Sequence, residues 1–339
     1  MEFDPKTQKL KCPYCDTVFD INDYVASHSS GSEATSADQY NTESKDENGQ
    51  DLFIYSCGSC GGEILATETQ GAMKCPFCSN NIVVQNKFDG VFKPDYIIPF
   101  AKTKEDAMEA YKKHVKSKRL VPKVFLRDNH IDEIRGVYVP FWIYSATQNY
   151  SGSFEATKIR TWQDSEYIHT ETSYYDVQRV GTEDFTNVPE DGSKEMPDDL
   201  MESIEPFDTS AMVPFNMGYL AGFLANKYDV TAEENRARAE QRMAASASLD
   251  FRNTIQGYSS VIPRFENSKT SNERHKYAMY PVYVLNTTWK GKNYLFAMNG
   301  QTGKLVGNLP ASLSQTFKYY FPFAGIVAVI AFILSIVFG

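Results

Sequence analysis

The sequence lacks the usual signatures of catalysis and nucleotide binding. It contains no G-x-S-x-G, no H-E-x-x-H, no Walker A loop and no glycine fingerprint for a dinucleotide. Positive charge is also scarce, since 34 Lys and Arg face 43 Asp and Glu and leave a net charge of −9. Nucleic-acid proteins draw most of their affinity from clustered positive charge, so this balance argues against that class.

Hydrophobic residues are too few for a polytopic membrane protein, because the mean hydropathy is −0.42. They are numerous enough for a folded core, at 42% of the chain with 14% aromatic residues. The 339 residues allow one large domain or two. No catalytic set of side chains can be assembled, and we expect a protein that is not an enzyme.

One long uncharged run lies at the C-terminal end, from Tyr319 to Phe338. As a helix it would be about 30 Å long, which matches one hydrocarbon thickness. The first ten residues are polar and do not resemble a signal peptide. We therefore expect a single membrane-spanning tail anchor within 311–339, with the bulk of the chain in the cytoplasm at the cell membrane. A buried helix of the main domain is the alternative.

The six cysteines form three C-x-x-C pairs, and two of these pairs have the spacing of a zinc ribbon. The expected ligands of a structural Zn²⁺ are Cys57, Cys60, Cys75 and Cys78. Four thiolates fill a tetrahedral shell and leave no position for a catalytic water, so the zinc is expected to be structural. Reduced thiolates also favour the cytoplasm.

The third pair, Cys12 and Cys15, has the sequence of a zinc knuckle without its other two ligands. His28 is the nearest histidine, and it lies in a polar segment. We interpret this pair as an incomplete second metal site. It is either metal-free or completed by another chain.

The pattern along the chain predicts a β-rich α+β protein. The expected segments are an incomplete zinc knuckle (1–26), a disordered acidic linker (27–52), a rubredoxin-like zinc ribbon (53–92), a β-rich α+β domain (93–310) and the anchor (311–339). Within the large domain we expect a helix over 102–118 with an N-terminal cap at Thr103, and a second helix that begins with a capping box at Thr231. We also expect strands at 96–100 and 136–144, a surface loop over 182–206, and a hairpin within 294–307.

Two polar clusters could carry function. The segment DNHIDE contains Asp128, His130, Asp132 and Glu133, and it is either a metal or acid–base site or a polar turn. A basic run from Lys112 to Arg127 could contact an anionic lipid, an acidic partner or nucleic acid, or it could be the solvated face of a helix.

The segments at 57–84, 94–118, 134–145 and 294–310 resemble the bacterial TFIIB-type zinc-ribbon membrane proteins of the YdjG type. These proteins are often labelled as primosomal-protein or helicase relatives. The resemblance implies a membrane component that recruits a PspA-like protein and an SPFH protein during envelope stress. It also implies that Cys57, Cys60, Cys75 and Cys78 are the ribbon ligands, and that a further C-x-x-C pairs with Cys12 and Cys15, which this sequence does not contain.

The leading functional hypothesis is a non-enzymatic, tail-anchored adaptor that binds protein partners through its ribbon and β-rich domain. Such a scaffold could form homo- or hetero-oligomers. The alternative is a nucleic-acid-binding or replication-accessory protein, and the few cations near the ribbon argue against it.

Overall fold

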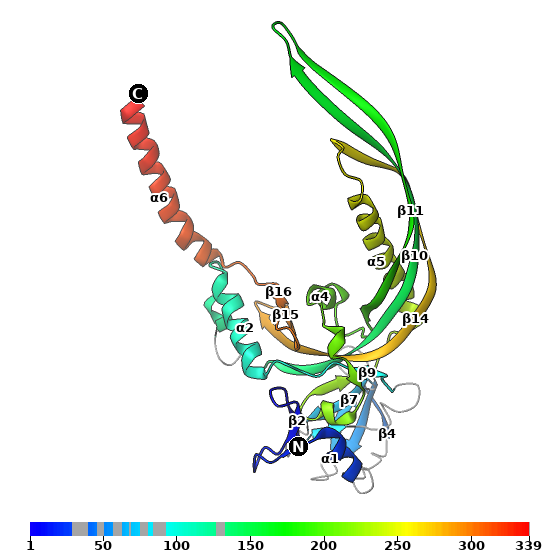
Figure 1. Cartoon of the computed structure of the whole chain (residues 1–339). Helices are drawn as coiled ribbons and strands as arrows, with labels where there is room; N and C mark the ends of the chain where they lie inside the picture. The colour runs from blue at the N-terminus through cyan, green and yellow to red at the C-terminus, as the bar shows by residue number, and fades with distance from the viewer. Residues whose placement is uncertain are drawn as a thin grey trace.

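The computed structural model describes residues 1–28, 40–45, 51–56, 63–67, 69–74, 81–83, 93–126 and 133–338 (Figure 1). The strands are β1 (Glu2–Asp4), β2 (Lys9–Lys11), β3 (Val18–Phe19), β4 (Tyr40–Lys45), β5 (Asp51–Ser56), β6 (Glu63–Thr67), β7 (Gln70–Lys74), β8 (Asn81–Val83), β9 (Tyr96–Ile97), β10 (Arg135–Gln163), β11 (Ile168–Asp191), β12 (Val213–Pro214), β13 (Leu224–Asn226), β14 (Ser260–Trp289), β15 (Lys292–Asn299) and β16 (Leu305–Gly307). The helices are α1 (Ile21–His28), α2 (Lys104–Ser117), α4 (Asp198–Ser203), α5 (Ala232–Asn253) and α6 (Leu313–Phe338), with 3-10 turns η3 (Lys123–Leu126), η4 (Thr209–Ala211) and η5 (Met217–Leu220).

A mixed sheet organises the molecule around two long central strands. Its strand order is β12-β9-β14-β10-β13-β7-β8, with β11 also paired to β10, and β15 and β16 added beside β14. Two smaller sheets, β1-β2-β3 and β4-β5-β6, belong to the N-terminal part. Antiparallel pairing of β10 with β14 and with β11 therefore builds most of the architecture.

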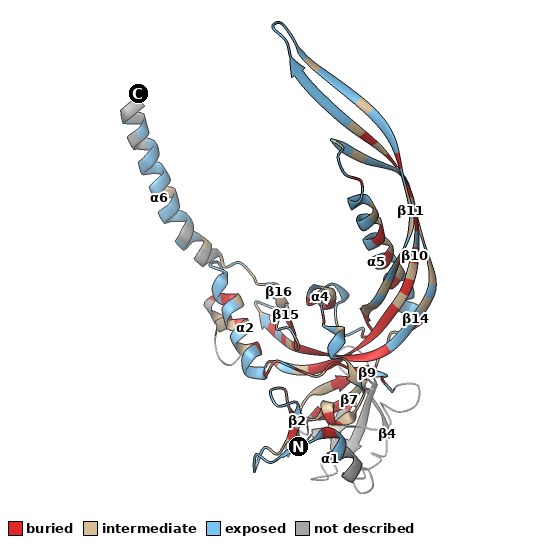
Figure 2. Ribbon diagram, viewed as in Figure 1, coloured by how far each residue is buried: buried red, intermediate tan, exposed pale blue. Residues whose placement is uncertain are grey.

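Strand β10 passes through three different environments along its length (Figure 2). From Val137 to Tyr144 every side chain is buried, because one hydrophobic cluster covers each face of the sheet. From Tyr144 to Ala156 buried positions alternate with more exposed ones, as expected for a strand covered on one face. From Lys158 to Gln163 every side chain is exposed.

The two longest helices outside the C-terminal region form where local signals specify them. Thr103 caps α2 and forms a reciprocal capping box with Asp106, and Thr231 and Glu234 do the same for α5. Helix α2 buries an apolar stripe that includes Tyr111, whose ring meets that of Phe296 edge-on at 5.1 Å. These observations confirm the helices predicted over 102–118 and from Thr231.

The predicted hairpin within 294–307 is also confirmed, because β15 pairs with β16 in antiparallel register. The surface loop predicted over 182–206 is wrong. Strand β11 continues to Asp191, and α4 follows at Asp198–Ser203. The acidic residues that suggested a loop include Glu183 and Asp184, which occupy a strand with much of its surface exposed, so their polarity does not exclude pairing.

The β-rich α+β character of the chain is observed, but the membrane-spanning helix and the zinc ribbon of the predicted fold are not found in the described residues. In the part of the chain that the structure describes, no helix is long and apolar enough to cross a membrane. No group of three or more His, Cys, Asp or Glu residues there could hold a metal ion, so a zinc ribbon is not found. The first prediction used the length of an uncharged run, a linear signal that does not fix a three-dimensional arrangement, and the four ribbon cysteines of the second lie outside the described residues.

Candidate functional site

The predicted zinc ligands differ in what the structure describes of them. Cys57, Cys60, Cys75 and Cys78 lie outside the described residues, so the zinc expected there stays a prediction. Cys12 and Cys15 are described as free thiols near β2 and β3, and no third ligand joins them within the described residues. The Cys15 Sγ lies 3.1 Å from the Thr17 hydroxyl, and this hydrogen bonding lowers the pKa of the thiol.

The other candidate residues do not assemble into one site. Of the DNHIDE cluster, Asp128, His130 and Asp132 lie outside the described residues, and Glu133 is exposed. The described histidines of the large domain lie far apart in the fold. His114 is on α2, His169 is near the β10–β11 turn, and His275 packs against Trp142 at 5.7 Å.

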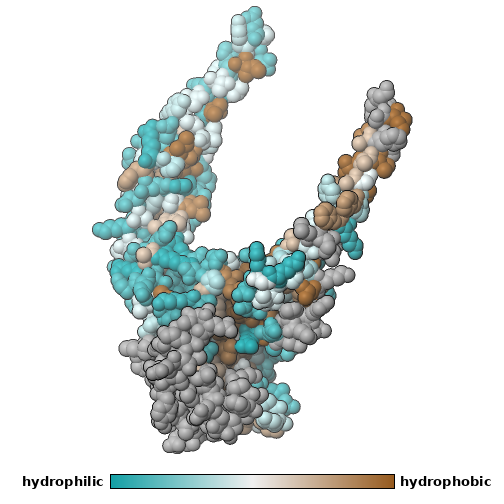
Figure 3. All heavy atoms as spheres, turned by 180° about the vertical axis from the view of Figure 1, so that it is seen from behind, coloured by the Kyte–Doolittle hydropathy of each residue, from teal (hydrophilic) through white to brown (hydrophobic). Residues whose placement is uncertain are grey.

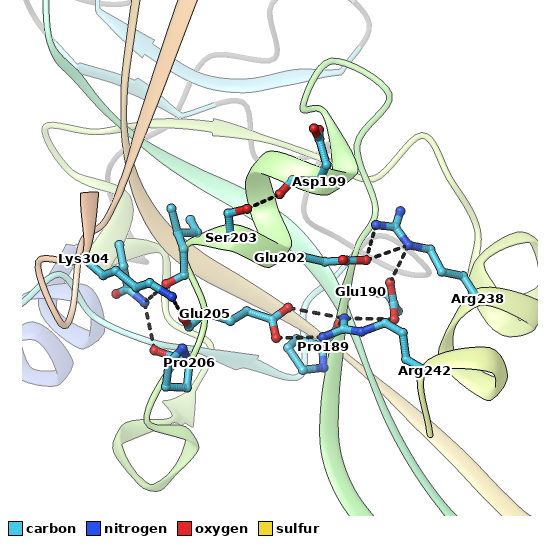
Figure 4. Close-up of polar contacts among 12 residues, drawn as sticks. Pro189, Glu190, Asp199, Glu202, Ser203, Glu205, Pro206, Arg238, Arg242 and Lys304 are labelled. Carbon is cyan, nitrogen blue, oxygen red and sulfur yellow. Dashed lines mark hydrogen bonds and ion pairs between the residues drawn. The ribbon is translucent and has the colours of Figure 1, made fainter. Parts of the chain in front are cut away.

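A buried ionic network, which the sequence analysis missed, joins α4 and α5 to the end of β11 (Figure 4). Arg242 on α5 pairs with the nearly inaccessible Glu190 at 3.0 Å and with Glu205 at 2.8 Å. Arg238, one helical turn earlier, lies 3.2 Å from the other oxygen of Glu190 and also pairs with Glu202 on α4. The two arginines therefore hold three separate segments together.

Burial has a strong effect on the carboxyl groups of this network. Burial raises the pKa of Glu190 to about 7, although Arg242 and Arg238 oppose the shift. Burial and the neighbouring Asp198 raise the pKa of Asp191 to about 7. A carboxyl group that titrates near neutrality can serve in acid–base chemistry. Both oxygens of Glu190 face arginines that are paired with other carboxylates as well. This arrangement fits a role in holding the segments together.

The feature that sets this molecule apart is a projecting three-stranded arm. We define the arm as 146–163 of β10, 168–185 of β11 and 260–271 of β14, in the order β11-β10-β14. The β10–β11 pairing runs without a break in register from Ala146 with Phe185 to Gln163 with Ile168. At about 3.4 Å per residue the hairpin is roughly 60 Å long. Figure 1 shows it rising from the body, with α5 along one face.

Helix α5 stabilises the lower part of the arm. Tyr150 of β10 stacks on Phe251 of α5 at 4.5 Å, and Phe154 lies in the same buried cluster. The hydroxyl group of Tyr150 donates to Glu266 of β14 at 2.7 Å. Glu266 also accepts from Ser248 and Arg252, and these contacts lower its pKa to about 2. The helix and all three strands are therefore connected at this level.

The tip of the arm extends beyond that support and carries large exposed side chains. Trp162, Tyr167 and Ile168 are 44%, 64% and 69% exposed. Trp162 stacks on His169 at 5.3 Å, and the Arg160 guanidinium lies 5.3 Å from the same ring. Figure 3 shows hydrophobic residues scattered over the otherwise hydrophilic surface of this projection. Trp162, Tyr167 and Ile168, by contrast, lie together at the same hairpin end, and exposed aromatic and aliphatic residues that gather in this way mark interaction surfaces.

Both edges of the arm are open. Among the described residues, the arm segments of β11 and β14 pair only with β10, so each has an outer row of backbone groups without a strand partner. Charged residues such as Asp176, Glu183 and Asp184 lie along β11 and discourage indiscriminate pairing. Regular strand geometry with open edges is nonetheless suited to strand addition by another chain.

The sequence held a signal for the arm, because aromatic, alternating segments continue through Tyr150 to Gly181. From Ser145 to Thr157 polar residues alternate with a second set that is largely apolar and is interrupted by Gln148 and Gly152. That period of two indicates one strand through the whole interval. No local signal announces the ionic network, because Glu190 and Arg242 are 52 residues apart.

Comparison with known proteins identified a curated relative in Bacillus subtilis (strain 168), the uncharacterized protein YdjG. It is 31% identical to this chain over 243 residues, which cover 72% of this chain and 71% of the relative. No family model matches the chain. No solved structure matches it either.

Proposed function

This chain belongs to the family of the Bacillus subtilis protein YdjG, and from that premise and the exposed arm we propose that it is a non-enzymatic adaptor that binds protein partners. The arm is the proposed binding surface. The partners that the family resemblance implies are an SPFH protein and a PspA-like protein.

The observation that carries this proposal is the change in burial along β10. Every side chain of the strand is buried at Val137–Tyr144 and every one is exposed at Lys158–Gln163, although its pairing with β11 continues to the tip. A chain gains little stability by extending a hairpin beyond its supporting helix, because no core forms there. The extension is useful to a protein that must present side chains and strand edges to another protein.

Two features of the arm would contribute different parts of the binding. The open edges of β11 and β14 supply regular backbone donors and acceptors for an added strand. The tip supplies Trp162 and Tyr167, and Trp and Tyr are the residue types most enriched among binding hot spots. The edges would give affinity, and the tip would give selectivity.

The test uses the full-length chain with a purification tag, produced in its own cells and crosslinked before purification. The tip variant carries Trp162→Ala, Tyr167→Ala and Ile168→Ala. The matched control carries Gln163→Ala, Thr170→Ala and Glu171→Ala, which are exposed polar residues of the same hairpin. We expect the wild type and the control to recover an SPFH or PspA-like protein, and the tip variant to recover at least tenfold less.

If the tip variant recovers as much of the partner protein as the wild type, the tip of the arm is not the binding surface. Substrate turnover by the purified chain would contradict a non-enzymatic role. Recovery of nucleic acid or replication proteins in place of these partners would favour the replication-accessory alternative. Direct binding of the purified partner to each variant would then establish whether the tip itself makes the contact.

A further inference from the structure

A cavity of about 490 Å³ lies where the C-terminal end of α2 meets the segment that connects β16 to α6. Its walls come from His114 and Ser117–Val121 on one side and Gly307–Ala311 on the other. The backbone N–H of Ser312 donates to the Leu120 carbonyl at 2.8 Å, which ties the two sides together next to the cavity. The volume falls within the range of small-molecule sites.

One side of this cavity carries positive charge. Lys118 and Arg119 both line it and are both exposed. Neither forms an ion pair with any residue in the described part of the chain, whereas Arg238 and Arg242 of α5 are each held by two or more carboxylates. In a chain with a net charge of −9, two adjacent cations without carboxylate partners make a local anion-attracting surface.

A histidine with unused hydrogen-bonding capacity lines the same cavity. The imidazole of His114 hydrogen-bonds the backbone of Gly307, and its Nε2 is buried without a partner among the described residues. Burial, together with Lys118, lowers the pKa of His114 and favours its neutral form. An anion bound nearby would favour the protonated, positively charged imidazole.

The remaining wall is apolar. Leu120, Val121, Leu309 and Pro310 line it, and Leu120 is 38% exposed. A small inorganic anion would leave this wall without a contact. A ligand with an apolar chain would cover it and gain from removing that surface from water.

We propose that this cavity binds a phosphate ester that carries an apolar chain, with the phosphate against Lys118 and Arg119 and the chain against Val121 and Leu309. A phosphate has several acceptor oxygens, which suit the point charge of a lysine and the planar fork of an arginine together. The site goes beyond the proposed adaptor function and is separate from the arm.

The experiment measures binding to the full-length chain by titration calorimetry with three probes. These are dioctanoyl phosphatidic acid as a monomer, inorganic phosphate and uncharged dioctanoylglycerol. The cavity variant carries Lys118→Gln and Arg119→Gln. The control variant carries Lys113→Gln and Lys116→Gln, which remove the same charge from exposed positions of α2 that do not line the cavity. A further variant, Leu309→Asn, tests the apolar wall.

We expect the phosphatidic acid to bind the wild type and the control within twofold of each other, and the cavity variant at least tenfold more weakly. Leu309→Asn should weaken the phosphatidic acid by several fold and leave inorganic phosphate unchanged. If inorganic phosphate binds as tightly as the lipid, the cavity binds an anion, and the proposed contact between an apolar chain and the apolar wall is wrong. Equal binding to the cavity and control variants, equal binding of dioctanoylglycerol, or no binding of any probe would overturn the proposal.

Discussion

The stretch of β10 and β11 directly below the arm, which we call the base, and the tip of the arm are built from the same two strands, yet they differ in what holds them. At the base, Phe141 and its neighbours are buried on both faces of the sheet. At the tip, the pairing of β10 with β11 continues in register without a cluster on either face. Backbone pairing and a few side-chain contacts on the hairpin surface therefore maintain the shape of the tip, while core packing maintains the base.

This contrast separates the residues that stabilise the fold from the residues that are accessible to another molecule. Substitutions at the base lower the free energy of unfolding because a close-packed interior cannot adjust to lost volume. Substitutions at the tip change only what another molecule can contact. The following predictions test how sharply the two properties divide along one strand.

The largest effect is expected for Phe141→Ala at the base. The ring of Phe141 is 1% exposed and stacks on Tyr280 at 4.6 Å. The free energy of unfolding should fall by about 3–5 kcal/mol, the usual cost of removing a buried phenyl ring. Urea unfolding of the full-length chain measures it, with Ile159→Ala at the exposed tip as the matched control. A loss below about 1 kcal/mol would show that the base is not the packed region described here.

The next effect concerns the ionic network and pH. The pKa of Glu190 is raised from 4.5 to about 7, so its carboxyl group binds its proton more tightly in the folded chain. Its contribution to stability is therefore full below pH 4.5 and is lost as the pH rises through 7. In the wild type, Glu190 should lower the free energy of unfolding by on the order of 2 kcal/mol as the pH rises from 5 to 8. In Glu190→Gln this part of the pH dependence should be absent.

The measurement is the pH dependence of urea unfolding, compared between variants by slope. The raised pKa of Asp191 acts in the same direction and persists in the variant, so some slope remains. Glu233→Gln, at an exposed position of α5, should leave the slope unchanged. An identical slope in Glu190→Gln and the wild type would contradict the buried, proton-binding carboxyl group.

A smaller effect is expected halfway along the arm, where α5 covers one face. Tyr150→Phe removes the hydroxyl group that donates to Glu266 but keeps the ring stacked on Phe251. Because Arg252 and Ser248 still satisfy Glu266, the loss should be about 1 kcal/mol. Tyr174→Phe, at a 71% exposed position, is the control and should leave the unfolding midpoint unchanged.

The smallest effect on stability is expected for Trp162→Ala at the tip. Its ring contacts Arg160 and His169 but no core, so the unfolding free energy should change by about 0.5 kcal/mol. Partner recovery, by contrast, should fall clearly. A stability loss as large as that of Phe141→Ala would mean that the tip depends on packing, and the division between the two ends of β10 would fail.

The elements that could be predicted from sequence are those whose signals are local. The caps of α2 and α5 lie within three residues of their partners, and the hairpin of β15 and β16 closes over a short turn. The partner of β10 could not be read in the same way. The continuation of β10 beyond Tyr144 depends on β14, whose pairing partners lie more than a hundred positions further along the chain, as for Gln148 and Thr270.

The candidate sites were likewise predictable only where their signals are local in sequence. The ionic network joins residues from α4, α5 and β11, and the cavity joins α2 to the segment after β16, so neither has a motif. The cysteine pairs are conspicuous because their spacing is local, and the zinc ligands they predict lie outside the described residues. Conversely, the acidic stretch that forms the end of β11 was interpreted as a loop because composition does not reveal a strand partner.

The order of pairing in the arm has a consequence for how the chain is made. Strands β10 and β11 are neighbours in sequence and can close as a hairpin as soon as both have left the ribosome. Strand β14 is synthesised only after α4 and α5. Until then one edge of β10 stays open through the base as well as the arm, and open edges of this kind are prone to aggregate. A nascent or truncated chain that stops before Ser260 is thus a natural client for chaperones, whereas the finished chain has that edge closed.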